Sequence, residues 1–190
     1  IATRAIIFDC FGVLTASTHK LFFDKYFKNQ PEKVEQVKAL DHATSNGSIT
    51  LDDFNRGLAE IAAISVDEVV AFVSQHVPNT ELLEFIRDEL KPRYKIGFLS
   101  NVGDDLMDVL FTDEQQALFD DVVLSFEVGI AKPQPEIYEL SAKNLGLDTT
   151  ECVFVDDVQR YIDGAEVAGM EAILFTSTEQ FKQDIAKLIQ

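Results

Sequence analysis

Short apolar segments that alternate with amphipathic helical segments constrain the fold of this chain more than any other feature. Five of them have the composition of buried strands, and helical periodicity fills most of the intervening stretches. The expected strands are "RAIIFD" (4–9), "YKIGFLSN" (94–101), "DVVLS" (121–125), "CVFVDD" (152–157) and "EAILFT" (171–176). Nearly continuous apolar strands that alternate with helices predict an α/β fold with a doubly wound, Rossmann-like parallel sheet.

Residues 16–79 interrupt this alternation, because they contain helical patterns and no good strand. Thr50 followed by Asp53 marks one helix start, as a variant of the capping box. We therefore predict an α/β catalytic core made of residues 1–15 and 80–190, with a small inserted helical cap over residues 16–79. An insertion after the carboxyl end of a strand lies over the usual ligand crevice of such a sheet, where it can act as a lid. The remaining expected helices cover residues 79–90, 103–111, 135–146, 159–170 and 177–190.

Charge and composition narrow the classes of partner. The 190 residues carry a formal net charge of −17, and no basic stripe of the kind that binds nucleic acid is present. No apolar run reaches the roughly 18 residues that a membrane span needs, and no secretory signal is visible. The two cysteines, Cys10 and Cys152, form no CxxC pattern and are expected to be reduced. These features predict a cytoplasmic protein that binds neither nucleic acid nor membrane. We expect a monomer or dimer, a choice that the sequence leaves open.

Polar side chains stand where the expected strands end. Asp9 closes the first strand, Ser100 and Asn101 close the second, and Asp156 and Asp157 close the fourth. Because the carboxyl ends of parallel strands meet at one edge of a sheet, these groups can converge there.

Lys132 lies in "GIAKPQPEIY", where Gly129 and two prolines indicate an ordered loop that delivers the lysine. Asp9 and Asp156 offer hard oxygen ligands, which suit Mg²⁺. Ser100 and Lys132 can donate hydrogen bonds to phosphate oxygens, and a carboxylate oxygen of Asp9 can attack phosphorus. The set therefore predicts phosphoryl transfer from a small phosphorylated substrate.

Four segments resemble, in order, the four motifs of the haloacid dehalogenase superfamily: "FDCFGVLT", "FLSN", "AKPQPEIY" and "VFVDDVQRYIDGAEVAGM". The insertion resembles that superfamily's helical cap, and its position together with Gly12 resembles the branch of sugar-phosphate phosphatases and epoxide hydrolase N-terminal domains. The resemblance implies a catalytic and metal-binding role for Asp9, and catalytic and substrate-binding roles for Ser100 and Lys132. It also implies substrate binding by Asn101, a metal ligand in Asp156, and support of the metal or its waters by Asp157.

The resemblance fails at Phe11, where phosphatases of this superfamily usually carry an Asp that protonates the leaving oxygen and later deprotonates the attacking water. General acid–base help is worth roughly 10²–10⁴-fold in rate, so its loss is expected to hurt poor leaving groups most. The resemblance still implies that the backbone carbonyl of Phe11 binds the metal. His19, at the entrance of the cap, is a candidate replacement for the missing acid, and His42 and His76 lie further into the cap.

Three functions remain open from the sequence. The one we expect is a Mg²⁺-dependent phosphoric monoester hydrolase that acts on a small phosphorylated metabolite through an aspartyl-phosphate on Asp9. The first alternative is a non-catalytic or weakly active relative that binds a phosphate ligand or a protein. The second is a 2-haloacid dehalogenase, which also carries an aromatic residue at the place of Phe11. Those enzymes use no metal and lack an Asp–Asp pair of the form of Asp156–Asp157, which favours the phosphatase.

Overall fold

The computed structural model describes residues 2–16, 18–45 and 48–189, without the side chains of residues 19, 20, 41, 42, 44 and 45. By its contacts the chain divides into two compact units. Unit 1 comprises Ile1–Ala16 and Pro78–Gln190, and unit 2 comprises Ser17–Val77. Among the described residues, no helix combines the length and the apolar character that crossing a membrane requires.

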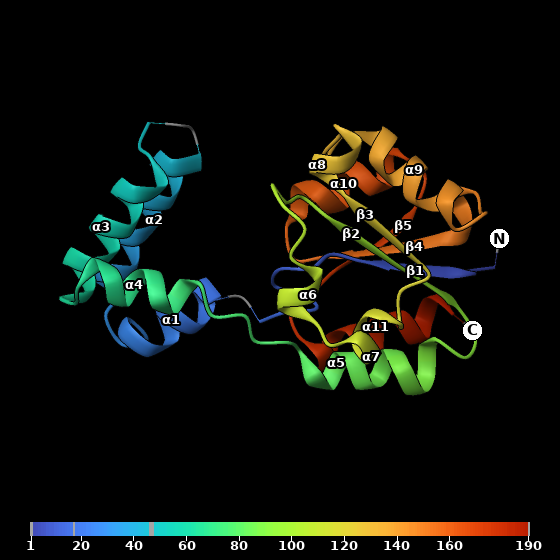
Figure 1. The fold of residues 1–190 in the computed structure, drawn as a ribbon, viewed down its shortest axis with the longest axis horizontal. Coiled ribbons are helices and arrows are strands. Elements are labelled where there is room, and N and C mark those ends of the chain that lie inside the picture. The colour runs from blue at the N-terminus through green and yellow to red at the C-terminus, as the bar shows by residue number, and fades with distance from the viewer. Residues whose placement is uncertain (1, 17, 46–47, 190) are drawn as a thin grey trace. The chain divides into compact units, whose positions relative to one another are not determined.

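Unit 1 is built on a parallel sheet with the strand order β3-β2-β1-β4-β5 (Figure 1). The strands are β1 (Ala5–Phe8), β2 (Lys95–Ser100), β3 (Asp121–Leu124), β4 (Cys152–Asp156) and β5 (Glu171–Leu174). The central strand β1 pairs with both of its neighbours, so that Phe8 stands beside Phe98 on one side and Val155 on the other. The predicted α/β fold with a doubly wound parallel sheet is confirmed.

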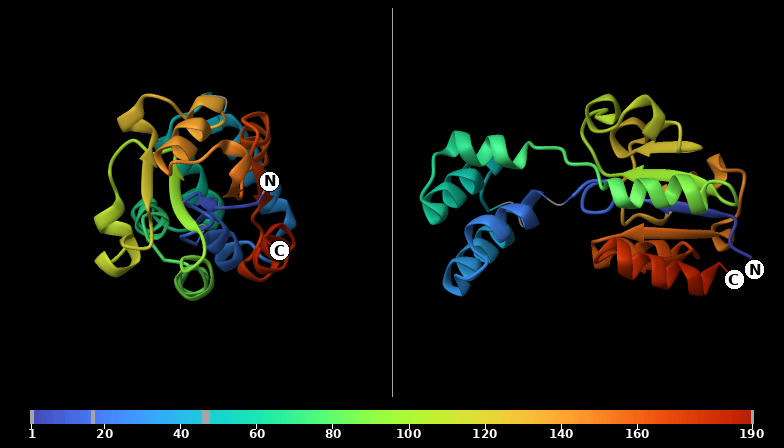
Figure 2. Two further views of the ribbon diagram at one scale, coloured as in Figure 1. Left: turned by 90° about the vertical axis from the view of Figure 1, so that its right-hand side faces the viewer. Right: turned by 90° about the horizontal axis from the view of Figure 1, so that it is seen from below.

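Helices cover both faces of this sheet, with α9 and α10 on one side and α5 and α11 on the other (Figures 1 and 2). The helical segments of unit 1 are α5 (Thr80–Phe85), η1 with π-helical bonding (Ile86–Leu90), α6 (Met107–Leu110), α7 (Asp113–Gln116), α8 (Ser125–Val128), α9 (Pro135–Asn144), the 3₁₀ turn η2 (Thr149–Glu151), α10 (Gln159–Val167) and α11 (Thr178–Leu188).

The side chains of β1 explain why its sequence is apolar throughout. Ile6 and Phe8 belong to the cluster that packs against α5 and α11, whereas Ala5 and Ile7 belong to the cluster under α9 and α10. All four are completely buried. Each large apolar side chain buried in this way stabilises the fold by roughly 1.5–3 kcal/mol, so both layers are held to the same strand.

The structure differs from the sequence-based prediction around α6 and α8. The helix expected over 103–111 begins only at Met107, because short acidic side chains bond the main chain ahead of it. Asp105 N donates to Asp104 Oδ1, and Met107 N donates to Asp105 Oδ1; such bonds compete with helix formation. Ser125, expected at the end of a strand, instead begins α8. Helices of four residues such as α7 and α8 are too short to show a hydrophobic period.

Unit 2 consists of helices around their own apolar cluster. They are α1 (Thr18–Tyr26), α2 (Pro31–Ser45), α3 (Leu51–Ala62) and α4 (Val66–Val73). Phe22 of α1 lies at the centre of the cluster, with its ring centroid 5.3 Å from that of Phe72. The capping box expected at Thr50 is confirmed, since Asp53 N donates to Thr50 Oγ1 at 3.1 Å and Thr50 N donates to Asp53 Oδ2 at 3.1 Å.

The two chain segments at the border of unit 1 lie side by side. Thr15 pairs with Pro78 as an antiparallel bridge, and Asn79 N donates to Leu14 O at 2.8 Å. Asn79 Nδ2 also donates to Val13 O at 3.0 Å. The chain therefore leaves unit 1 and returns to it at two neighbouring positions. The first of them follows β1 by a few residues.

Candidate active site

The three central strands bring acids and a serine to one edge of the sheet. Asp9 directly follows β1, and its N–H donates to Val155 O at 2.9 Å, so the β1–β4 pairing continues past the strand. Asp156 is the last residue of β4, and Ser100 is the last residue of β2. Because β2 and β4 flank β1, all of these residues stand at the same carboxyl edge, as expected for parallel strands.

Lys132 joins this edge from the loop before α9. Its ammonium donates to Asp9 Oδ1 and to Asp156 Oδ2, each at 2.6 Å, and its side chain is only 1% exposed. The ammonium also lies 4.8 Å from the ring centroid of Tyr161 and 5.4 Å from that of Phe154. Burial by itself lowers the pKa of Lys132, but the two carboxylates outweigh it and raise that pKa. The lysine therefore carries a positive charge between two acids.

The main chain of Lys132 is held by Asn101. Asn101 Nδ2 donates to Lys132 O at 3.0 Å, and Lys132 N donates to Asn101 Oδ1 at 2.9 Å. These reciprocal bonds fix the lysine loop to the end of β2. The substrate contact of Asn101 stays a prediction.

Residues of α9 and α10 support the same loop, and sequence reasoning did not single them out. Tyr138 Oη donates to Tyr161 O at 2.7 Å, which places the Tyr161 ring near the lysine. A Cβ at Gly164 would lie 2.6 Å from Pro133 O and 2.9 Å from Tyr138 Oη, so only glycine allows α10 to approach this closely. The one sequence signal for this contact is Gly164, the first glycine of "GAEVAGM".

The charges of the cluster do not balance. Burial, opposed by Lys132 and reinforced by Asp156, raises the pKa of Asp9 from 3.8 to about 7. Burial and Asp156 likewise raise the pKa of Asp157. Because, among the described side chains, these three acids share the ammonium of Lys132, the cluster has an excess of negative charge that a further cation would neutralise.

The acids are arranged as a metal site requires. Asp9, Asp156 and Asp157 each offer a carboxylate oxygen, and these oxygens lie within 4.8 Å of one another. Gly12, at φ +89°, permits this, because a Cβ there would lie 2.2 Å from Asp157 Oδ2. Carboxylate oxygens are hard ligands of the kind that Mg²⁺ prefers, so these residues fit a divalent cation of that class.

Ser100 completes the set with an unsatisfied hydroxyl. The residue is buried, and among the described residues its Oγ has no hydrogen-bond partner. A buried hydroxyl left in this way costs free energy, which a ligand oxygen at this place would recover. The predicted role of Ser100 in binding a phosphoryl group fits this position.

Phe11 lies in the turn that follows Asp9. Gly12 N donates to Thr15 O at 2.9 Å and closes the turn, and the Phe11 side chain is 38% exposed. Its ring has no proton to donate, so the acid–base gap seen in the sequence is present in the fold. The metal contact of the Phe11 carbonyl stays a prediction. The side chains of His19 and His42 lie outside the described residues, and His76 is exposed in unit 2.

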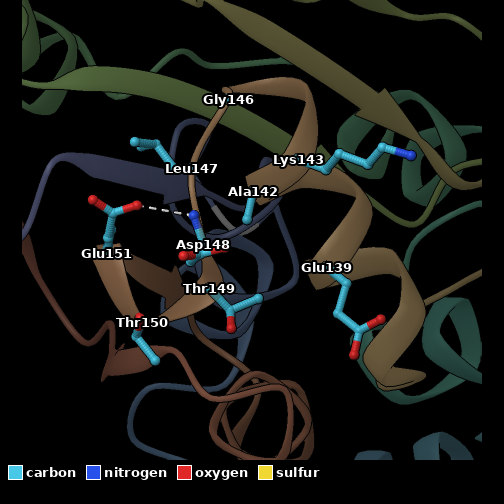
Figure 3. Close-up of a pocket in the computed structure, with 9 residues that line it drawn as sticks. All are labelled: Glu139, Ala142, Lys143, Gly146, Leu147, Asp148, Thr149, Thr150 and Glu151. Carbon is cyan, nitrogen blue, oxygen red and sulfur yellow. Dashed lines mark hydrogen bonds between the residues drawn. The ribbon is translucent and has the colours of Figure 1, made fainter.

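A cavity of about 740 Å³ lies away from this chemistry (Figure 3). Its lining comes from the end of α9 and from η2, with Asp148 N donating to Glu151 Oε2 at 3.0 Å. Because η2 directly precedes β4, the cavity lies near the amino edge of the sheet, opposite Asp9. No predicted site residue lines this cavity.

Comparisons with known proteins identify the family of the chain. The chain is 28% identical to Phosphatase MT3486 of Mycobacterium tuberculosis, over 96% of this chain and 92% of that protein. It is 23% identical to Sesquiterpene phosphatase astK of Aspergillus oryzae, over 98% and 96% of the two chains. A HAD family enzyme of Bacteroides thetaiotaomicron, solved with magnesium and inorganic phosphate, has the same fold, with a TM-score of 0.56, 23% identity and coverage of 96% and 98%. The family model of haloacid dehalogenase-like hydrolases matches residues 3–169. The chain therefore belongs to the haloacid dehalogenase-like hydrolases.

Proposed function

We propose that this hydrolase is a Mg²⁺-dependent phosphatase that acts on a small phosphorylated compound through an aspartyl-phosphate on Asp9. The observation that carries the proposal is the buried contact of Lys132 with Asp9 Oδ1 and Asp156 Oδ2. This contact orients a carboxylate beside a fixed positive charge, as attack on a phosphoryl group demands. The phosphatases among its relatives support the same reaction class.

The chain's own residues divide the work as follows. Lys132 holds Asp9 Oδ1, and we assign Oδ2 as the oxygen that attacks phosphorus and breaks the bond to the leaving oxygen. The Ser100 hydroxyl and the Lys132 ammonium donate to the phosphoryl oxygens as negative charge builds on them. Water then attacks the phosphorus of the aspartyl-phosphate, which releases phosphate and restores Asp9.

Asp9, Asp156 and Asp157 would hold the metal, together with the carbonyl of Phe11. A bound Mg²⁺ would neutralise negative charge on the transferring group. Because Phe11 provides no proton, the leaving oxygen takes its proton from water or departs as an anion. We therefore expect esters of acidic alcohols to react faster than simple alkyl esters. The helical unit over 17–77 is the part of the chain that we assign as the cap.

The test is phosphate release from an aryl phosphate with and without Mg²⁺. Wild type should release phosphate only with the metal, and Asp9→Asn should reduce the rate to background. Asp24→Asn, which removes an exposed acid of α1, is the matched control and should keep wild-type activity. Equal rates for wild type and Asp9→Asn would refute the proposal. Halide release from a 2-haloacid without metal would instead identify a dehalogenase.

A further inference from the structure

Exposed apolar residues follow three of the strands at the polar carboxyl edge of the sheet. Phe11 follows β1 and is 38% exposed, Phe126 follows β3 and is 44% exposed, and Val158 follows β4 and is 37% exposed. Single exposed apolar residues are common on protein surfaces. These three, however, all belong to the loops or short helix that follow the strand ends, which Figure 1 shows for α8 after β3. We call Phe11, Phe126 and Val158 the apolar rim.

Main-chain and side-chain bonds fix the rim relative to the acids. Val158 N donates to Asp156 Oδ1 at 2.9 Å. One hydrogen bond therefore joins the main chain of Val158 to a candidate metal ligand. Ser125 Oγ accepts from Val102 N at 3.0 Å and donates to Val102 O at 3.1 Å. This ties the start of α8, and with it Phe126, to the segment that follows β2. The rim is thus part of the ordered edge that carries the site.

The charged and polar groups of the same edge offer few further polar contacts to a substrate. The buried ammonium of Lys132 is paired with two carboxylates, and the Asn101 amide bonds the Lys132 main chain. With a net charge of −17, the chain also disfavours a second anionic group on the substrate. An apolar organic part would contact the rim without the loss of hydrogen bonds to water that a sugar would suffer.

From this arrangement we propose that the substrate is a phosphate monoester of an apolar alcohol, whose organic part packs against Phe126 and Val158. The proposal rests on the phosphatase function proposed above. Each methylene of the substrate removed from water adds binding free energy, so an apolar ester should exceed a polar one by roughly 10–100-fold in kcat/KM. The preference should appear mainly in KM.

The experiment compares two esters of equal size that differ in apolarity: 4-butylphenyl phosphate and 4-(3-hydroxypropyl)phenyl phosphate, whose phenols have similar acidity. Wild type should favour the butyl ester at least tenfold in kcat/KM. Phe126→Ser and Val158→Ser should each reduce this preference by roughly three- to tenfold, by raising KM for the butyl ester. Val167→Ser is the matched control, since Val167 is 75% exposed at the end of α10, shortly before β5 begins, and therefore lies toward the amino edge of the parallel sheet. Circular dichroism and thermal unfolding check that each variant is folded.

Two results would overturn the inference: equal kcat/KM for the two esters, or a butyl preference that neither rim variant alters. Calorimetric binding of the corresponding benzyl phosphonates to the Asp9→Asn protein separates this inference from the proposed function. Absence of hydrolysis with tighter binding of the butyl phosphonate would contradict the phosphatase and support the apolar specificity of the rim. Hydrolysis without any apolar preference would support the phosphatase and refute the inference.

Discussion

Replacing Asp9 by Asn should stabilise the metal-free protein while it abolishes activity. In the folded chain Asp9 is 7% exposed and shares one lysine with Asp156. Ionising both acids therefore leaves a net negative charge in a buried cluster. Asn removes that charge, keeps a side-chain oxygen that can accept from Lys132, and leaves Lys132 paired with Asp156.

The size and the sign of the effect follow from the pKa of Asp9, which burial raises from 3.8 to about 7. At ~1.36 kcal/mol per pKa unit, ionising Asp9 in the folded chain costs at most roughly 4 kcal/mol. A raised pKa means that the folded state holds its proton longer than the unfolded state. Wild-type stability from this group is thus complete below about pH 4 and is lost as the pH rises to about 7. We expect Asp9→Asn to gain roughly 2 kcal/mol at pH 8 and little at pH 4.

Urea unfolding in the presence of a chelator, at pH 4, 5, 6, 7 and 8, measures this difference. Asp24→Asn removes an exposed acid instead, and should change the free energy of unfolding by less than ~0.5 kcal/mol at every pH. Adding Mg²⁺ should stabilise wild type more than Asp9→Asn, because the variant lacks one of the carboxylates of the candidate site. A gain that is the same at pH 4 and pH 8, or a variant less stable than wild type at pH 8, would refute the electrostatic reasoning.

Two further substitutions test how the site is held. Asn101→Ala removes both bonds to the main chain of Lys132; we expect kcat for an aryl phosphate to fall roughly tenfold or more, with a loss of only ~1–2 kcal/mol in unfolding free energy. An unchanged kcat would show that the lysine loop keeps its position without Asn101. Gly12→Ala would place a Cβ 2.2 Å from Asp157 Oδ2, so the affinity for Mg²⁺, measured by calorimetry, should weaken. Gly103→Ala is the control, because its Cβ would have no heavy atom of the described chain within 4 Å, and it should bind Mg²⁺ as wild type does. Equal affinities for the two variants would remove Asp157 from the metal site.

The sequence predicted the sheet and the edge where polar residues gather, because both depend on local patterns. A strand buried on both faces must be apolar along its buried length, as β1 is and as β4 is up to its last residue, Asp156. An acid that ends such a strand is therefore visible as a break in an apolar run, which identifies Asp9 and Asp156 without any tertiary information. Parallel pairing then requires that these acids meet at one edge.

The contacts that hold Lys132 could not be predicted in the same way. Asn101 and Lys132 are 31 positions apart, and nothing in either local segment shows that their amide and main-chain groups will pair. The close approach of Gly164 to the lysine loop depends likewise on how α10 packs on the sheet. The late start of α6 was missed for another reason: Asp104 and Asp105 lie within the expected helix, but their side chains bond the main chain instead.

Phe11 connects the two unusual properties of this site. Because its side chain has no acidic proton, Phe11 cannot protonate the leaving oxygen. This favours phosphates of acidic alcohols, whose oxygen leaves without acid catalysis. As an exposed aromatic ring beside Asp9, it belongs to the apolar rim, which favours an apolar organic part. A phenol meets both requirements, because its oxygen is a good leaving group and its aromatic ring is apolar. The primary hydroxyl of a sugar meets neither, so aryl phosphates should be hydrolysed faster than hexose 6-phosphates of equal charge.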